Sequence, residues 1–254
     1  MIPREIENLS VTFEEKTPQE IIDWDVETFC PDNAMSSSFQ THSVPLLHMV
    51  GQIEPNMRIY FTNTSFNFWD TLMFREQLES IWNLNIVDLR AEDSWRIFLR
   101  RFGRDLYTQD PDLCCFVHKV QPMQGALAGV KAWITGIRRD QNAHSSKAKI
   151  LENQKNGLLK INPILNWGRR DIWRNIQEYD LPEHPLLKKG YTSIGCVPCT
   201  RRVIPGDGAR SGHWQGMGKT EFGLHTEMFE LKGSSPFEVI ADFTSGQQDE
   251  DGGR

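Results

Sequence analysis

The chain has 254 residues and carries 28 Lys and Arg against 34 Asp and Glu, which gives a formal net charge of −6. A chain of this length can bury a sizeable core in one domain. The acidic balance argues against a nucleic-acid partner, because neutralising phosphates requires clustered excess cations. No apolar run is long enough to span a bilayer, and the N-terminal MIPREIENLS lacks the apolar segment of a signal peptide. We therefore expect a soluble cytoplasmic protein with no membrane partner.

The first strong element is a helix that begins after Thr17. Thr17 is the expected N-cap, Pro18 takes the first helical position, and Glu20 completes a capping box. An apolar stripe follows and is broken at Pro31. Cys30 lies at the end of this stripe, where we expect a buried and chemically inert thiol.

A Ser-rich turn comes next. Ser36, Ser37 and Ser38 separate a short strand from an apolar helical pattern that starts at Val44. This layout points backbone N–H groups at an anion. Ser-rich turns are also common helix caps, and the pattern alone favours that ordinary structural role.

The middle of the chain alternates short apolar runs with helical patterns. The apolar runs predict strands at Met57–Phe61, Ile86–Leu89, Ala132–Thr135 and Leu158–Ile164. The helical patterns predict helices at Asp70–Trp82, around Ser94–Phe102, from Leu113 onward, and from Asp171 to the residues before Pro182. This repetition predicts an α/β fold, with a mostly parallel twisted sheet and helices on both faces.

We expect one domain over residues 1–244. The sheet should end near residue 180, and the remaining chain should form a C-terminal lobe over the carboxyl ends of the strands, where open α/β sheets bind ligands. Residues 245–254, SGQQDEDGGR, are polar, Gly-rich and free of apolar side chains, so we expect a disordered tail.

Four of the five cysteines form two pairs, the adjacent Cys114 and Cys115 and the C-x-x-C pair Cys196 and Cys199. In a reducing compartment such grouping favours metal or redox chemistry over disulfides. A single zinc ion usually takes two C-x-x-C pairs, and the side chains of adjacent cysteines diverge. A 4Fe-4S cluster offers separated iron corners and accepts an adjacent pair more easily. Spacing therefore favours a cluster slightly over zinc, and both over unrelated buried cysteines.

Two arginines, Arg138 and Arg139, follow the predicted strand at Ala132–Thr135, within the segment Gly136–Gln141. Beside a Ser-rich turn at the same sheet edge, they would form a bidentate clamp for an anion. An exposed turn held by ion pairs explains the same residues equally well.

Together these segments resemble the assimilatory sulfonucleotide reductases, which reduce adenylyl sulfate or phosphoadenylyl sulfate. The resemblance runs from about residue 34 to residue 225, and its motifs are S-S-S-F at 36–39, C-C at 114–115 with Lys119, G-x-R-R-D-Q at 136–141, G-Y-x-S-I-G-C-x-P-C-T-R at 190–201 and K-T-E-x-G-L-H at 219–225. It implies an adenine nucleotide alpha-hydrolase-like sheet with a cluster-bearing C-terminal lobe. It also implies that the four paired cysteines hold a 4Fe-4S cluster and that unphosphorylated adenylyl sulfate is the substrate.

The resemblance further implies a reaction and a set of ligand-binding residues. In the family a cysteine of the final K-x-E-C-G-L-H motif attacks the sulfonyl sulfur, AMP leaves, and thioredoxin releases sulfite from the S-sulfocysteine. The residues that would surround the sulfate and phosphate are Ser36, Ser37, Ser38, Lys119, Arg138, Arg139 and Arg210.

The sequence departs from the family pattern around this pocket. Phe222 occupies the position of the nucleophilic cysteine, and a phenyl ring has no thiolate. Asn63-Thr64-Ser65 replaces the usual Asp-Thr-Gly, and His118 and His213 stand where Arg is expected.

Two hypotheses follow from this disagreement. In the first, the chain is an adenylyl-sulfate reductase whose attacking thiol comes from elsewhere, such as another subunit of a homo- or hetero-oligomer. In the second, it is a catalytically inactive, cluster-bearing pseudoenzyme that binds adenylyl sulfate or AMP and regulates an active reductase.

Overall fold

The computed structural model describes residues 3–91, 100, 103, 105–142, 145–203, 212–214, 219, 223–225 and 229. The chain divides into two compact units. The first, which we call the sheet unit, comprises Met1–Phe61, Phe68–Asp88 and Leu127–Gly190. The second, which we call the cysteine unit, comprises Thr62–Asn67, Leu89–Ala126 and Tyr191–Arg254. The expectation of one domain over residues 1–244 stays a prediction.

A six-stranded sheet with the order β3-β2-β1-β4-β6-β5 forms the centre of the fold. The strands are β1 (Asn33–Ser36), β2 (Arg58–Thr62), β3 (Ile86–Leu89), β4 (Ala132–Ile134), β5 (Leu151–Asn153) and β6 (Leu159–Ile161). The pairs β1–β2, β1–β4 and β4–β6 are parallel, whereas β5 runs antiparallel to β6. The mostly parallel sheet is thus confirmed. Because β1 and β4 are parallel neighbours, the turns that follow them leave the same edge of the sheet.

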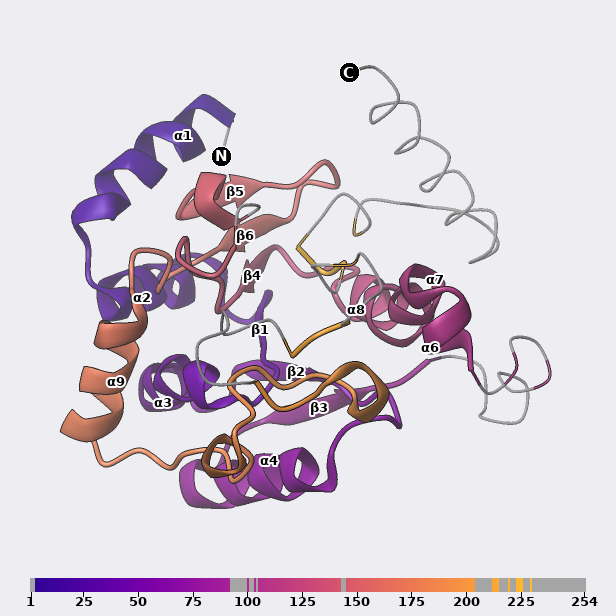
Figure 1. Cartoon of the computed structure of the whole chain (residues 1–254). Coiled ribbons are helices and arrows are strands. Elements are labelled where there is room, and N and C mark those ends of the chain that lie inside the picture. Colours follow the sequence, from indigo (N-terminus) through magenta and orange to yellow (C-terminus); the bar gives the residue numbers. More distant parts are fainter. Residues whose placement is uncertain are drawn as a thin grey trace, which may run out of the picture. The chain divides into compact units, whose positions relative to one another are not determined.

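The helices of the sheet unit are α1 (Pro3–Thr12), η1 (Phe13–Glu15), α2 (Pro18–Phe29), η2 (Thr41–Ser43), α3 (Val44–Ile53), α4 (Trp69–Trp82), η4 (Ser145–Lys147), α9 (Arg169–Glu178) and η5 (Leu187–Lys189). Those of the cysteine unit are α6 (Leu106–Gln109), α7 (Pro111–Cys115), the π-helical segment η3 (Phe116–Val120), α8 (Gln121–Ala126) and η6 (Val197–Cys199). Helices α2, α3 and α9 lie side by side along the strands, and α1 lies against β5 (Figure 1).

The main apolar core lies on one face of the sheet. Met35, Ile59 and Ile134 of the central strands pack there with apolar side chains of α2, α3, α4 and α9. The alternate strand positions point to the other face, and Tyr60 and Trp133 are buried there as well. Burial on both faces is what parallel sheets require, because their strands are covered on both sides.

The capping signals are confirmed in α2. Thr17 accepts a hydrogen bond from the backbone N–H of Glu20, and the Glu20 carboxylate accepts one from the N–H of Thr17. The start predicted for the last helix is displaced. Helix α9 begins at Arg169, and Asp171 instead closes a box with the N–H of Gly168. Asp171 is therefore a capping residue within the first turn of the helix.

Other sequence expectations are wrong or are not covered by the structure. Cys30 is exposed, because it caps α2 beyond the last residue of the buried stripe. Helix α1 and the antiparallel strand β5 were not expected. The helix expected around Ser94–Phe102 falls almost entirely outside the described residues, and the tail at 245–254 lies wholly outside them.

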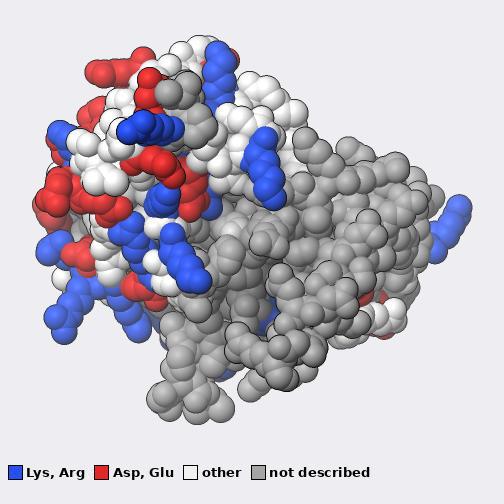
Figure 2. Space-filling view, turned by 90° about the horizontal axis from the view of Figure 1, so that it is seen from above, with Lys and Arg blue, Asp and Glu red and all other residues white. Residues whose placement is uncertain are grey.

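Two observations on the described residues concern helix length and the distribution of surface charge. None of the helices formed by the described residues is long and apolar enough to cross a bilayer. On the face seen in Figure 2, basic and acidic side chains of the described residues are interspersed, without a continuous basic area. Such mixing agrees with the mildly acidic net charge.

Candidate functional site

The four paired cysteines come together in one cavity of the cysteine unit. Its lining residues are Phe66, Tyr107, Pro111, Cys114, Cys115, His118, Lys119, Cys196, Pro198, Cys199 and Trp214. The two pairs come from distant parts of the sequence, so the fold itself unites them. Apart from the thiols, the wall is mainly aromatic and proline, with one histidine and one lysine.

The adjacent pair ends a short helix. Asp110 accepts a hydrogen bond from the N–H of Leu113, at 2.8 Å, and thereby caps α7. The chain then passes into the π-helical segment η3, which brings His118 and Lys119 to the same cavity as the two cysteines. Wide helical turns of this kind are rare and are frequently found at functional sites.

The C-x-x-C pair flanks the 3₁₀ turn η6. Cys196 precedes this turn, and the N–H of Cys199 donates back to the carbonyl of Cys196 at 3.0 Å. The turn is attached to the segment Thr62–Asn67 by a β-bridge between Asn67 and Cys196. The Thr64 hydroxyl lies 3.3 Å from the Cys196 sulfur. The altered triplet Asn63-Thr64-Ser65 therefore supports a cysteine of the site.

Ser65 in this triplet has a φ of 63°. A left-handed backbone of this kind favours glycine, which explains the Gly of the family pattern at this position. Residue 213 also has a structural role. Nε2 of His213 lies 2.8 Å from the Ser193 hydroxyl, and the N–H of Trp214 donates to the carbonyl of Cys199 at 3.2 Å. The segment Gly212–Trp214 thus fastens the C-x-x-C turn.

Burial keeps three of the cysteines protonated as free thiols. It is the largest cause of the raised pKa values of Cys114 and Cys115, and it raises the pKa of Cys199 to about 11. The neighbouring thiols add to this rise for each of them. A protonated thiol is a poor nucleophile, whereas metal binding removes the proton. The environment therefore suits metal ligands better than attacking groups.

Two lysines supply positive charge beside the thiols. Lys119 is buried, and its charge acts to lower the pKa values of Cys114 and Cys115. Lys219 has a 6 % exposed side chain, forms an ion pair with Asp112, and lies 5.8 Å above the Trp214 ring. Positive charge at these positions favours thiolates and any anionic group that binds near them.

The donor set fits an iron–sulfur cluster. Among the described residues, no three His, Cys, Asp or Glu side chains are arranged to hold one metal ion. A cluster does not require such a triple, because each of four thiolates binds a different iron. Four cysteines around one cavity, with lysines to balance the charge, supply that arrangement of ligand types.

The Ser-rich turn has the expected strand–turn–helix layout in the sheet unit. The Ser36 hydroxyl accepts a hydrogen bond from the Trp133 indole N–H at 2.9 Å, and the Ser37 hydroxyl accepts one from the N–H of Phe39 at 3.1 Å. Phe39 adopts a φ of 54° and is fully buried, with its ring edge-on to Phe61. The direction of the chain after β1 is therefore fixed by packing.

Arg138 is buried at the carboxyl end of β4. Its Nε donates to Asp140 at 3.0 Å, and its backbone N–H donates to the Gln141 side chain at 3.2 Å. The Arg138 charge also acts on His42, whose pKa is lowered to about 4 by burial first and then by Arg138 and Arg169. Arg138 thus belongs with the turn after β1, at the neighbouring strand end.

His42 is a member of this group that the sequence alone did not single out. Its only signal is its place within the Ser-rich turn, because an isolated histidine carries no spacing pattern. With its lowered pKa, His42 is neutral at pH 7 and offers one donor and one acceptor nitrogen beside a buried arginine.

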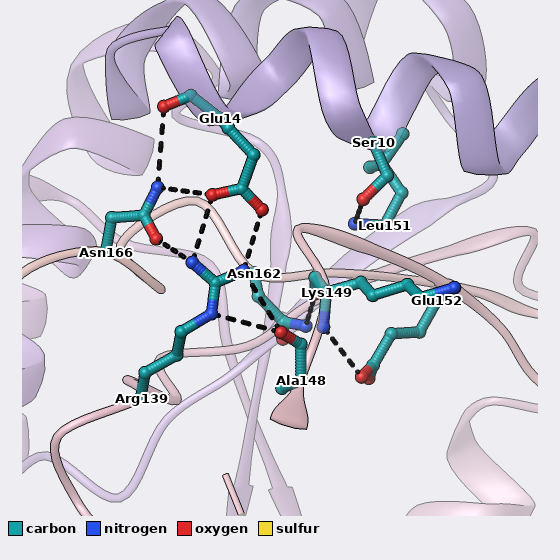
Figure 3. Close-up of polar contacts among 9 residues, drawn as sticks. All are labelled: Ser10, Glu14, Arg139, Ala148, Lys149, Leu151, Glu152, Asn162 and Asn166. Carbon is teal, nitrogen blue, oxygen red and sulfur yellow. Dashed lines mark hydrogen bonds and ion pairs between the residues drawn. The ribbon is translucent and has the colours of Figure 1, made fainter. Parts of the chain in front are cut away.

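Arg139 points to different partners (Figure 3). Its two terminal nitrogens form a bidentate ion pair with Glu14, at 3.0 and 2.7 Å. Arg139 also donates to the Asn166 side chain and, through Nε, to the carbonyl of Ala148. Hydrogen bonding to Arg139 is the main reason that the pKa of Glu14 is lowered. The arrangement matches the ion-paired turn that we considered as the alternative to an anion clamp, and anion binding by Arg139 stays a prediction.

The remaining site predictions divide between the two units or fall outside the description. Ser36, Ser37, Ser38, Arg138 and Arg139 belong to the sheet unit, and Lys119 belongs to the cysteine unit. Arg210 and Phe222 lie outside the described residues.

Comparisons with known proteins agree on one family. Residues 32–202 match the model of the phosphoadenosine phosphosulfate reductase domain. An adenosine 5'-phosphosulfate reductase of Streptomyces coelicolor is 36% identical over 213 residues, which cover 84% of this chain and 89% of that protein. A phosphoadenosine 5'-phosphosulfate reductase of Gloeobacter violaceus is 34% identical over 226 residues, covering 87% and 93%.

A solved structure gives the same result. The phosphate complex of the phosphoadenylyl-sulfate reductase from Candida auris aligns with a TM-score of 0.70 and 28% identity, over 79% of this chain and 98% of that one. An FMN adenylyltransferase from Candida glabrata aligns with a TM-score of 0.54 at 15% identity, over 77% of this chain and 70% of that one, and so shares the fold alone.

Proposed function

We propose a function from the premise that the chain belongs to the phosphoadenosine phosphosulfate reductase domain family. The proposal is that it is a sulfonucleotide reductase of sulfate assimilation and acts on adenylyl sulfate. The choice of substrate rests on one observation: Cys114, Cys115, Cys196 and Cys199 line the same cavity. In the family these two pairs accompany the unphosphorylated nucleotide. The similarity to adenosine 5'-phosphosulfate reductases over most of the chain supports the same choice.

We infer that the four cysteines hold a 4Fe-4S cluster. When bound, such a cluster ties the two cysteine pairs together and adds a fixed charge beside the site. The chain's own contribution is the surrounding shell. Thr64 contacts one ligand sulfur, and Lys119 and Lys219 balance the negative charge of the thiolates.

The anionic part of the nucleotide is assigned to the two turns at the strand ends. Ser36, Ser37 and Ser38 offer hydroxyl and backbone donors, and Arg138 offers a buried guanidinium at the end of the adjacent strand. The resemblance also implies Lys119, Arg139 and Arg210, and Arg139 would have to give up a contact with Glu14, Asn166 or Ala148 to bind the anion itself. A cation that is already desolvated binds sulfate or phosphate strongly, because water does not screen the pair.

Sulfite release requires two thiols in succession. The first thiolate forms a bond to the sulfonyl sulfur while the bond from that sulfur to the phosphate oxygen breaks, so that AMP leaves with the electron pair. The second thiolate attacks the sulfur of the first thiol and forms a disulfide with it. Sulfite leaves with the electron pair of the broken bond between the two sulfurs. Two thiols are oxidised and the sulfonyl sulfur is reduced by two electrons.

The first thiol does not come from position 222 in this chain, because that residue is Phe222. Burial protonates Cys114, Cys115 and Cys199 when they are free, and desolvation together with the Glu54 carboxylate raises the pKa of Cys30. We therefore assign both thiols to a partner, either a dithiol protein such as thioredoxin or another subunit, in the cytoplasm. The alternative of a regulatory pseudoenzyme has no support in the comparisons.

Sulfite release from adenylyl sulfate by the anaerobically purified protein tests this proposal. With thioredoxin supplied, we expect release above the rate of thioredoxin alone, because the bound nucleotide is held for attack. The Phe222→Cys variant should release sulfite faster by about 100-fold or more, since it restores a thiol within the chain at the position that the resemblance gives to the nucleophile. A matched Phe229→Cys variant controls for an added thiol nearby in sequence. Failure of both the native chain and Phe222→Cys, with nucleotide bound, would contradict the proposal.

A further inference from the structure

Every donor of the Arg139 guanidinium is already used within the sheet unit. One terminal nitrogen donates to Glu14 and Asn166, and the other donates to Glu14 and the carbonyl of Ala148. Nε donates to the same carbonyl at 3.2 Å. A guanidinium carries five N–H groups, so none is left for a ligand unless one of these contacts breaks.

Glu14 is held in place by the packing around it. It belongs to η1, whose first residue, Phe13, is buried and stacks edge-on against Trp24 with ring centroids 5.0 Å apart. The Asn166 amide donates to the Glu14 carboxylate at 2.9 Å. The carboxylate is therefore a fixed anion at the end of the N-terminal segment, rather than a mobile surface group.

The preceding helix is fastened to the same part of the sheet (Figure 3). The Ser10 hydroxyl of α1 accepts a hydrogen bond from the N–H of Leu151 in β5 at 3.0 Å. Glu7 of α1 forms an exposed ion pair with Lys149 at 3.2 Å. The N-terminal segment thus contacts β5 through α1 and the turn after β4 through η1.

The position of Arg139 fixes the position of its neighbour. The N–H of Arg139 donates to the carbonyl of Leu165 at 3.0 Å, so both its backbone and its side chain are anchored. Arg138 is the preceding residue, and it is buried toward His42 and the turn after β1. Because one peptide bond joins the two residues, a shift of the Arg139 backbone would shift Arg138 as well.

We propose that Glu14 is a positioning residue for the anion-binding turn: by holding Arg139, it sets Arg138 for the phosphate or sulfate of the ligand. The N-terminal segment 3–15 is then part of the nucleotide site, although its own side chains do not touch the ligand. The identity of the ligand in this inference rests on the proposed function. The anchoring of the turn by Glu14 rests on the geometry alone.

Calorimetric titration with AMP and with adenosine tests the proposal, because only AMP carries the anion. Glu14→Gln should weaken AMP binding by about tenfold, the loss expected for one charged hydrogen-bonded contact, and should leave adenosine binding within about twofold. Glu14→Asp keeps the carboxylate and should recover most of the AMP affinity. Glu7→Gln removes a different ion pair of the same segment, the one with Lys149, and is the matched control, with unchanged affinity for both ligands.

A purely structural role gives different results. Equal losses for AMP and adenosine, or no loss for either, would overturn the proposal. Backbone hydrogen exchange provides a readout that needs no ligand: the N–H groups of Arg139 and Gln141 should exchange faster in Glu14→Gln and at the native rate in Glu7→Gln. If the native chain binds neither AMP nor adenylyl sulfate, the proposed function fails, while the exchange rates still decide whether Glu14 holds the turn.

Discussion

The two candidate regions differ in how their functional groups are held. In the turns after β1 and β4, Ser36, Ser37 and Arg139 already have protein partners within hydrogen-bonding distance. In the cysteine cavity the sulfurs of Cys114, Cys115 and Cys199 are buried with raised pKa values. The first region is arranged before any ligand arrives. The second has four thiols gathered around one cavity, and under the proposed function their charged form depends on a metal.

This difference predicts which region tolerates change. In a preorganised polar turn each substitution should lower the affinity for the anion by a limited amount, because each contact contributes a few kcal/mol at most. A cysteine cavity loses its function as a whole, because a four-thiolate site that lacks one ligand no longer completes its coordination.

Removal of one cysteine should have the largest effect. In Cys199→Ser we expect the brown colour and broad visible absorption of a cluster to disappear, and bound iron and sulfide to fall close to zero per chain. Cys30→Ser is the matched control, since Cys30 is exposed and lies in the other unit. An iron content equal to that of the native protein in Cys199→Ser would refute the ligand assignment.

Removal of the buried arginine should have a graded effect. Arg138→Ala should weaken AMP binding by about thirtyfold, or about 2 kcal/mol, with the iron content unchanged. Arg174→Ala provides a comparison, because Arg174 is an exposed arginine paired with Asp171 in α9. Titration calorimetry measures both variants. An affinity for AMP that is the same in Arg138→Ala and Arg174→Ala would remove Arg138 from the site.

Acidification should have a smaller effect than either substitution, and the quantity that changes is the free energy of unfolding. Burial lowers the pKa of His184 to about 4, whereas an unfolded histidine titrates near 6.5. Between these values the unfolded chain binds more protons, so the stability that neutral His184 contributes is complete above pH 6.5 and is lost as the pH falls toward 4.

Between pH 7 and pH 5 this loss amounts to roughly 1–2 kcal/mol from His184 alone. Denaturant unfolding at the two pH values measures it. In His184→Gln the drop between pH 7 and pH 5 should shrink by that amount, whatever the absolute stability of the variant. His42 and His118 also have pKa values lowered to about 4, so part of the drop should remain. If the free energy of unfolding of His184→Gln fell as much between pH 7 and pH 5 as that of the native protein, the lowered pKa of His184 would be contradicted.

The parts of the fold with local signals could be predicted from the sequence. The capping box at Thr17 and Glu20 located α2, and the run Ile86–Leu89 coincides with β3. Strand β5 has only three residues and pairs with β6, the next strand, in a hairpin that turns over Gln154–Leu158. The signal for this hairpin is the Asn156-Gly157 turn, rather than the longer apolar runs on which the strand predictions were based. The burial of Cys30 was predicted wrongly, because periodicity does not tell where the packed face of a helix ends.

The candidate site divides in the same way. The residue types and spacing of the two cysteine pairs indicated that they belong together. That the side chain of Arg139 is held by protein groups depends on Glu14 and Asn166, both distant in sequence. His42 joins the candidate site only because the fold places it near Arg138, at the end of the neighbouring strand. Such pairings are tertiary and leave no trace in local composition.

The π-helical segment Phe116–Val120 makes chain length at this point as important as residue identity. A π turn holds one more residue than an α turn, and both cysteines and Lys119 line the same cavity. Lys119 follows Cys114 by five residues, the spacing that a π turn brings to one face. At ordinary α pitch His118, which is four residues after Cys114, would take that place. The width of this turn therefore selects which side chain lies beside Cys114, independently of the residues that the segment carries.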